Sequence, residues 1–143
     1  MKTGLASPRT FLSRLAADRD GVTAVEFAVI MPILLFLTIG LIDISRFVWY
    51  QTTLEHAARE GSRYASVRPG TATAGDIEAY IYNRTIGISD ADLGVTVSWT
   101  PTNAPGNTVT INVSYDYSPI IANFLPFEAI QLSTASTLIM SQI

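Results

Sequence analysis

Residues 22–42 read VTAVEFAVIMPILLFLTIGLI, a segment that is apolar apart from Thr23, Glu26 and Thr38. As an α-helix this segment would be about 31 Å long, at a rise of about 1.5 Å per residue, which is enough to cross the hydrocarbon core of a bilayer. The segment therefore predicts one membrane-spanning helix. Its single charge, at Glu26, needs an explanation, because an ionisable residue within a membrane span is costly and points to a function.

A short basic leader, residues 1–21, precedes this segment. Its basic residues are Lys2, Arg9, Arg14 and Arg19. Basic segments next to a membrane helix favour the cytoplasm, so we expect the leader inside and the residues beyond about 43 outside. Arg46 lies on the far side, so the asymmetry is not absolute. A conventional secretory signal is a poor fit, because the apolar run exceeds the usual length of about 7–15 residues and no small-residue cleavage site follows it.

The helical pattern continues through residues 43–68. Apolar or small side chains recur there at intervals of three or four, which is typical of an amphipathic helix. They are Phe47, Tyr50, Leu54, Ala57, Gly61 and Tyr64. The pair Pro69-Gly70 should end the helix. We therefore predict one helix whose first part faces lipid and whose second part packs on a folded domain.

Residues 69–143 predict that domain. Thr73 can cap a short helix over about residues 74–86. Alternating apolar and polar residues then predict strands at about 93–100, 108–117 and 130–141, with the first two joined as a hairpin by the turn-rich loop PTNAPGNT. The fold class is α+β: a long N-terminal helix packed on a small antiparallel sheet.

The composition argues against several classes of function. The chain has no cysteine and a single histidine, His56, which we interpret as a solvent-exposed helical residue. No motif for a cofactor, a phosphate or a metal ion is present, so we expect no enzyme activity and no cofactor. Beyond Pro69 the only basic residue is Arg84, and nucleic-acid binding needs clustered basic residues.

Cleavage between Gly21 and Val22 would give Glu26 a purpose. The new α-amino group at Val22 would be largely cationic, since its unperturbed pKa is near 7.7–8.0. Glu26 lies four residues further on, which is the same face of a helix. The carboxylate could pair with its own terminus or with that of a neighbouring chain. Pairing with a neighbour would set the axial register between adjacent helices, and the leader would prevent it until cleavage.

A basic leader ending in Gly21, then Val22-Thr23-Ala24-Val25, then Glu26-Phe27 and an apolar helix, resembles the class III signal of type IV pilins and pseudopilins. The stretch from Asp20 to Val67, which contains AAREGSRYA, is similar to the TadE-like family of pilus-assembly proteins, as are VTINVSYDYSPII and IQLSTASTLIM nearer the C-terminus. The resemblance implies a minor pilin or pseudopilin of a tight-adherence, Flp-type (type IVc) pilus.

The resemblance also implies partners and roles. The partners are a prepilin peptidase, other pilins or pseudopilins, an inner-membrane platform with a secretion ATPase, and the lipid of a bacterial inner membrane. Gly21 would precede the cut, Val22 would become the N-terminus, and Glu26 with Phe27 would complete the processing signal. Pro32 should loosen the span, and it is either a tolerated membrane-helix proline or part of helix assembly.

Alternatives remain open from the sequence alone. An uncleaved, single-span protein could present a domain that binds a ligand or an envelope component. A secreted enzyme is a further alternative. The small residues of AAREGSRYA could pack inside the domain or contact another subunit.

Overall fold

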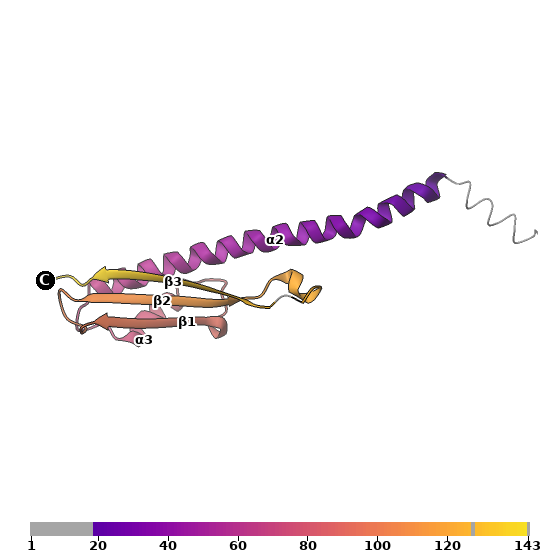
Figure 1. Ribbon diagram of the computed structural model, residues 1–143. Coiled ribbons are helices and arrows are strands. Elements are labelled where there is room, and N and C mark those ends of the chain that lie inside the picture. The colour runs from indigo at the N-terminus through magenta and orange to yellow at the C-terminus, as the bar shows by residue number, and fades with distance from the viewer. Residues whose placement is uncertain (1–18, 127, 143) are drawn as a thin grey trace, which may run out of the picture. The chain divides into compact units, whose positions relative to one another are not determined.

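The computed structural model describes residues 19–126 and 128–142, so most of the predicted leader lies outside the described residues. The chain divides into two units, residues 1–41 and 42–143. The described part of the first unit is helical. The second unit combines helices with a three-stranded sheet (Figure 1), so the predicted α+β class is confirmed.

Helix α2 comprises Arg19–Ser66 and continues through Pro32. Its described part includes three residues before the predicted start at Val22, and the single Gly21 is tolerated within it. After α2, the turn at Pro69-Gly70 has Gly70 at φ 71°, a left-handed conformation that glycine adopts without a steric penalty. This turn redirects the chain toward α3.

Helix α3 comprises Ala74–Tyr82 and begins with a capping box. The Thr73 hydroxyl accepts from the Asp76 backbone N–H at 3.2 Å, and the Asp76 carboxylate accepts from the Thr73 N–H at 3.0 Å. The helix ends at Tyr82 rather than at about 86. The Asn83 side chain donates to the carbonyl of Ala79, and Thr85 caps two further carbonyls, so the last turn is closed by side chains.

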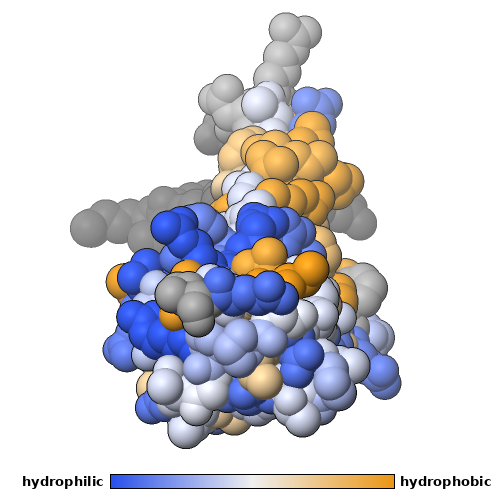
Figure 2. All heavy atoms as spheres, turned by 90° about the vertical axis from the view of Figure 1, so that its left-hand side faces the viewer, coloured by the Kyte–Doolittle hydropathy of each residue, from blue (hydrophilic) through white to orange (hydrophobic). Residues whose placement is uncertain are grey.

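Strands β1 (Leu93–Thr100), β2 (Thr108–Tyr117) and β3 (Ile130–Ile139) form an antiparallel sheet in the order β1-β2-β3. The register pairs Val97 with Ile111, and Ile111 with Ser136, so one face of every strand turns inward. Two short 3₁₀ helices flank the sheet: η1 (Asp90–Asp92) precedes β1, and η2 (Ile120–Asn123) follows β2. In Figure 2 the face of the domain turned to the viewer is largely hydrophilic.

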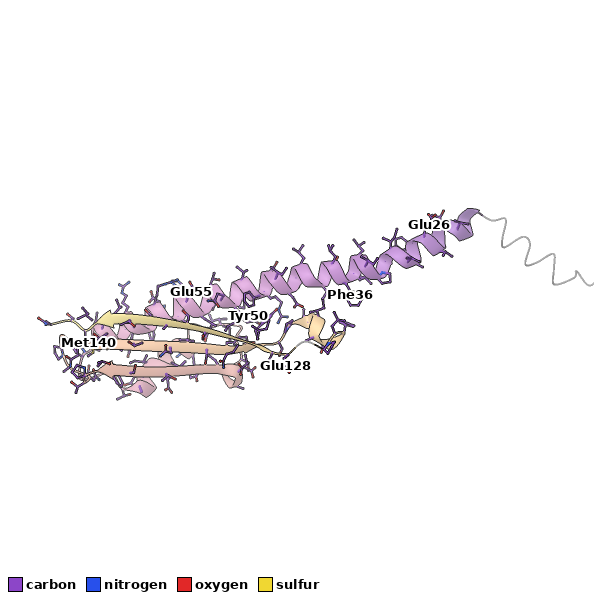
Figure 3. The ribbon with its side chains drawn as sticks, in the orientation of Figure 1. Glu26, Phe36, Tyr50, Glu55, Glu128 and Met140 are labelled. Atoms are coloured by element: carbon purple, nitrogen blue, oxygen red, sulfur yellow. The ribbon has the colours of Figure 1, made fainter. Side chains whose placement is uncertain are left out.

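The core of the second unit lies between the amphipathic part of α2, helix α3 and the inner face of the sheet. Figure 3 shows Tyr50 pointing from α2 toward the strands. The apolar residues of this core that are fully or almost fully buried are Leu54, Ala57, Ala58, Ala65, Ile77, Ile81, Val109, Ile111, Val113, Tyr117 and Met140. The domain therefore depends on residues 50–65 of the long helix for part of its core, as expected for a sheet of only three strands.

Candidate processing site and helix anchor

The predicted processing residues lie in the first turns of α2. Figure 3 places Glu26 near the N-terminal end of that helix. Val22 and Glu26 are one turn apart on the same side, about 6 Å along the axis at 1.5 Å per residue, and Phe27 is 58% exposed. The Gly21–Val22 peptide bond is part of the first helical turns. The geometry thus brings Val22 and Glu26 together, while their roles in cleavage and pairing stay predictions.

The apolar side chains of residues 22–42 have little protein around them. Val25 is 65% exposed, Leu34 53% and Leu35 52%, and at about 100° per residue these three positions lie on different sides of the helix. One helix in the described chain, Gly21–Ser66, is long and apolar enough to cross a membrane, with a mean hydropathy of 2.5 in its most apolar window. A helix that is hydrophobic on all sides needs an apolar environment. A lipid bilayer would satisfy this requirement.

Pro32 lies inside this apolar part of α2. A proline has no N–H to donate to the carbonyl four residues before it, here that of Ala28. The helix nevertheless continues on both sides of Pro32. Whether Pro32 is merely tolerated or contributes to helix assembly stays a prediction.

Asp43 is the first buried residue of α2 in the described chain, and it immediately follows the apolar segment. Its carboxylate accepts from the backbone N–H of Ile120 at 2.9 Å and from that of Ile121 at 2.8 Å. The Tyr117 hydroxyl donates to both the backbone carbonyl and the carboxylate of Asp43, at 3.0 and 3.2 Å. One side chain therefore fastens the helix to the end of β2 and the start of η2.

The electrostatics of this anchor favour an ionised carboxylate. Burial alone would raise the pKa of Asp43, but the two loop N–H groups, the Tyr117 hydroxyl and the nearby Arg46 together lower that pKa below its ordinary value. The Arg46 guanidinium lies 3.6 Å from the carboxylate. Burial raises the pKa of Tyr117, and the adjacent Asp43 charge raises it further, so the phenol remains a donor.

Aromatic rings surround the anchor. The Arg46 guanidinium lies 5.7 Å from the ring centroid of Tyr50 and 5.6 Å from that of Tyr117, within the range of cation–π attraction. Tyr50 stacks on Tyr115 with centroids 4.9 Å apart, and Phe47 meets Tyr117 edge to face at 5.9 Å. These contacts hold one end of the sheet against α2.

Small residues allow a second close contact between α2 and the rest of the domain. A Cβ atom on Gly61 would lie 2.7 Å from Cδ1 of Ile81 and 3.2 Å from Cδ1 of Ile111, both closer than side chains normally approach. One residue on, the Ser62 hydroxyl is 2.7 Å from that of Ser136 on β3. Of the two interpretations of AAREGSRYA, the structure therefore supports packing inside the domain.

The N-terminal part of the chain has a match among known families. Residues 21–63 match the family model described as TadE-like protein. This segment is TadE-like. Over these residues the match confirms the family resemblance seen in the sequence. No curated protein and no solved structure matches the chain significantly.

The TadE-like segment begins at Gly21, the residue expected before the cut, and it contains Glu26, Asp43 and Gly61. It ends at Arg63, so the match does not extend to residues 109–121 and 130–140, where the sequence also resembles the family. The family match thus covers the predicted processing site and the helix side of the Asp43 anchor.

His56 lies on the exposed side of the TadE-like segment. It lines a shallow groove of about 520 Å³ together with Trp49, Glu60 and Arg84. Within residues 19–126 and 128–142, no three His, Cys, Asp or Glu residues are grouped closely enough to hold a metal ion. This arrangement agrees with the interpretation of His56 as a solvent-exposed helical residue.

Proposed function

We propose that the protein is a minor pilin or pseudopilin that takes part in assembly of a type IVc (Flp/Tad) pilus. The observation that carries the proposal is the TadE-like match, which starts at Gly21 and coincides with an apolar helix able to span a membrane. The protein acts by assembly rather than by catalysis. Its partners are the prepilin peptidase, other pilins or pseudopilins and the inner-membrane platform of the Tad machine.

The proposed topology follows from the charges and the helix. The leader stays in the cytoplasm, residues 22–42 cross the inner membrane once, and the domain that begins near Asp43 lies in the periplasm. Assembly would withdraw the helix from lipid into contact with neighbouring helices. The mostly exposed apolar side chains of residues 22–42 suit both environments, since lipid and packed helices both exclude water.

The proposed role of Glu26 depends on cleavage between Gly21 and Val22. Because that bond lies in helical turns, binding to the peptidase would have to unwind the start of α2. Cleavage would then leave Val22 as a terminal cation and Glu26 as an anion one turn away. In surroundings of low dielectric constant this attraction is much stronger than in water, so pairing with a neighbouring terminus would fix the register between subunits.

Terminal mass spectrometry of protein from cells that contain the peptidase tests the processing step. We expect a mature chain that begins at Val22. A substitution Gly21→Phe should leave the precursor in the inner membrane, whereas Gly40→Ala is a matched control, because a Cβ at Gly40 would meet no atom within 4 Å. A chain that still begins at Met1 would instead support the alternative, an uncleaved, membrane-anchored binding domain.

Piliation tests the register role of Glu26 separately. Glu26→Ala should leave membrane insertion intact but impair piliation, and Glu26→Asp should impair it less because the charge is kept. Normal piliation by Glu26→Ala would refute the pairing, even if cleavage at Gly21 proved correct.

A further inference from the structure

The loop after β2 exposes an apolar surface. Its sequence over residues 118–127 is SPIIANFLPF, and no charged residue lies between Asp116 and Glu128. Phe124 is 62% exposed, Leu125 41% and Ile120 37%. Large apolar side chains gathered on one uncharged loop are unusual on a soluble surface and commonly mark an interaction site.

The position of the loop is fixed by the anchor at Asp43. The backbone N–H groups of Ile120 and Ile121 donate to the Asp43 carboxylate, and the loop therefore starts beside the helical residue that follows Ile42. Ile42 is the last residue of the segment long enough to cross the membrane. The start of η2 therefore contacts the residue that directly follows the apolar segment.

The backbone of the loop is already suited to such a boundary. The N–H groups of Phe124 and Leu125 both donate to the carbonyl of Ile121 at 3.0 Å, and that of Ala122 donates to the carbonyl of Pro119 at 3.2 Å. The two prolines that flank this stretch, Pro119 and Pro126, have no N–H. Backbone donors that enter an apolar medium must be satisfied internally, and most of those in residues 119–126 are.

We propose that the loop of residues 118–126 inserts Ile120, Phe124 and Leu125 into the interfacial region of the lipid bilayer from which α2 emerges. The domain then contacts the membrane at two points, the spanning helix and this loop. The inference rests on the proposed membrane span of residues 22–42. Lipid is the favoured occupant, because the loop is uncharged, is apolar and is tied to the end of an apolar segment rather than to the hydrophilic part of the domain.

Spin-label accessibility tests this inference, and the absence of native cysteine makes single labelling clean. Leu125→Cys reports on the loop, Leu35→Cys on the middle of the apolar segment, and Thr96→Cys on the exposed outer face of the sheet. The full chain is reconstituted in phosphatidylethanolamine–phosphatidylglycerol vesicles at a low ratio of protein to lipid. Collisions of each nitroxide with oxygen and with a water-soluble nickel complex are then compared.

We expect the ratio of oxygen to nickel accessibility at Leu125 to be several-fold higher than at Thr96, and lower than at Leu35. If this ratio is high at Leu35 but the ratio at Leu125 equals that at Thr96, the loop does not enter the membrane, although residues 22–42 do. Low accessibility of Leu125 to both reagents would mean that protein covers the loop, which would overturn the inference in favour of a second subunit. A water-exposed Leu35 would refute the span and this inference together.

Discussion

Replacing Asp43 with asparagine tests the anchor that fastens α2 to the sheet. The change keeps the size of the side chain but turns one accepting oxygen into an NH₂ group. One loop N–H therefore loses its acceptor, and the other donates to a neutral amide oxygen instead of a charged carboxylate oxygen. Hydrogen bonds to charged groups each contribute about 1.5–3 kcal/mol net. Losing one of them and weakening the second should destabilise the anchored loop by about 2–4 kcal/mol.

Hydrogen exchange in the full chain in detergent micelles measures this effect. If the substitution lowers the free energy of opening the loop by about 2–4 kcal/mol, the backbone amides of Ile120 and Ile121 should exchange about 30 to 1,000 times faster than in the wild type. Asp116→Asn makes the same chemical change at an exposed site whose carboxylate contacts Gln131 at 3.4 Å. That control should leave both rates unchanged. Unaltered protection of the two amides in Asp43→Asn would refute the argument that the carboxylate holds the loop.

Three further predictions concern stability. Gly61→Ala should lower the free energy of unfolding by about 1–3 kcal/mol, because the added methyl group overlaps Ile81. Gly40→Ala is the control and should not lower it. Denaturant unfolding followed by near-ultraviolet circular dichroism compares the two variants. The Asp43 pKa is lowered in the folded chain, so the stability it contributes is complete above the unfolded value near 3.9 and is lost as the pH falls through the folded pKa. The difference in stability between the wild type and Asp43→Asn should therefore shrink below about pH 4. Thr73→Ala should remove the capping box and cost about 1 kcal/mol, measured in the same unfolding assay.

Local sequence patterns predicted most of the architecture. The spacing of Tyr50, Leu54, Ala57 and Gly61 indicated the buried side of α2, and all four are buried. The alternation in β1 and β2 indicated a hairpin, and the two strands pair in register along their length. These features are visible in the sequence because neighbouring residues alone determine helical and strand periodicity.

The Asp43 anchor could not be predicted in this way. Asp43 and Tyr117 are 74 residues apart, and no local pattern links them. The available signal was a charged residue directly after an apolar segment and one turn before Arg46, a position that also suits a residue facing water at the membrane surface. The early end of α3 at Tyr82 has a different, local cause: the side chains of Asn83 and Thr85 donate to the last carbonyls of the helix.

The position of Asp43 has a mechanical consequence. It is the first buried residue in the described part of α2, so a pull applied to the helix from its N-terminal end reaches the folded domain there before it reaches the apolar core. The carboxylate and the main-chain carbonyl of Asp43 hold Tyr117 and two backbone amides at once. Tension is thereby divided among several hydrogen bonds at one point. If a subunit were pulled out of the membrane by its helix, the helix would stay bound to the sheet and the folded domain would move with it.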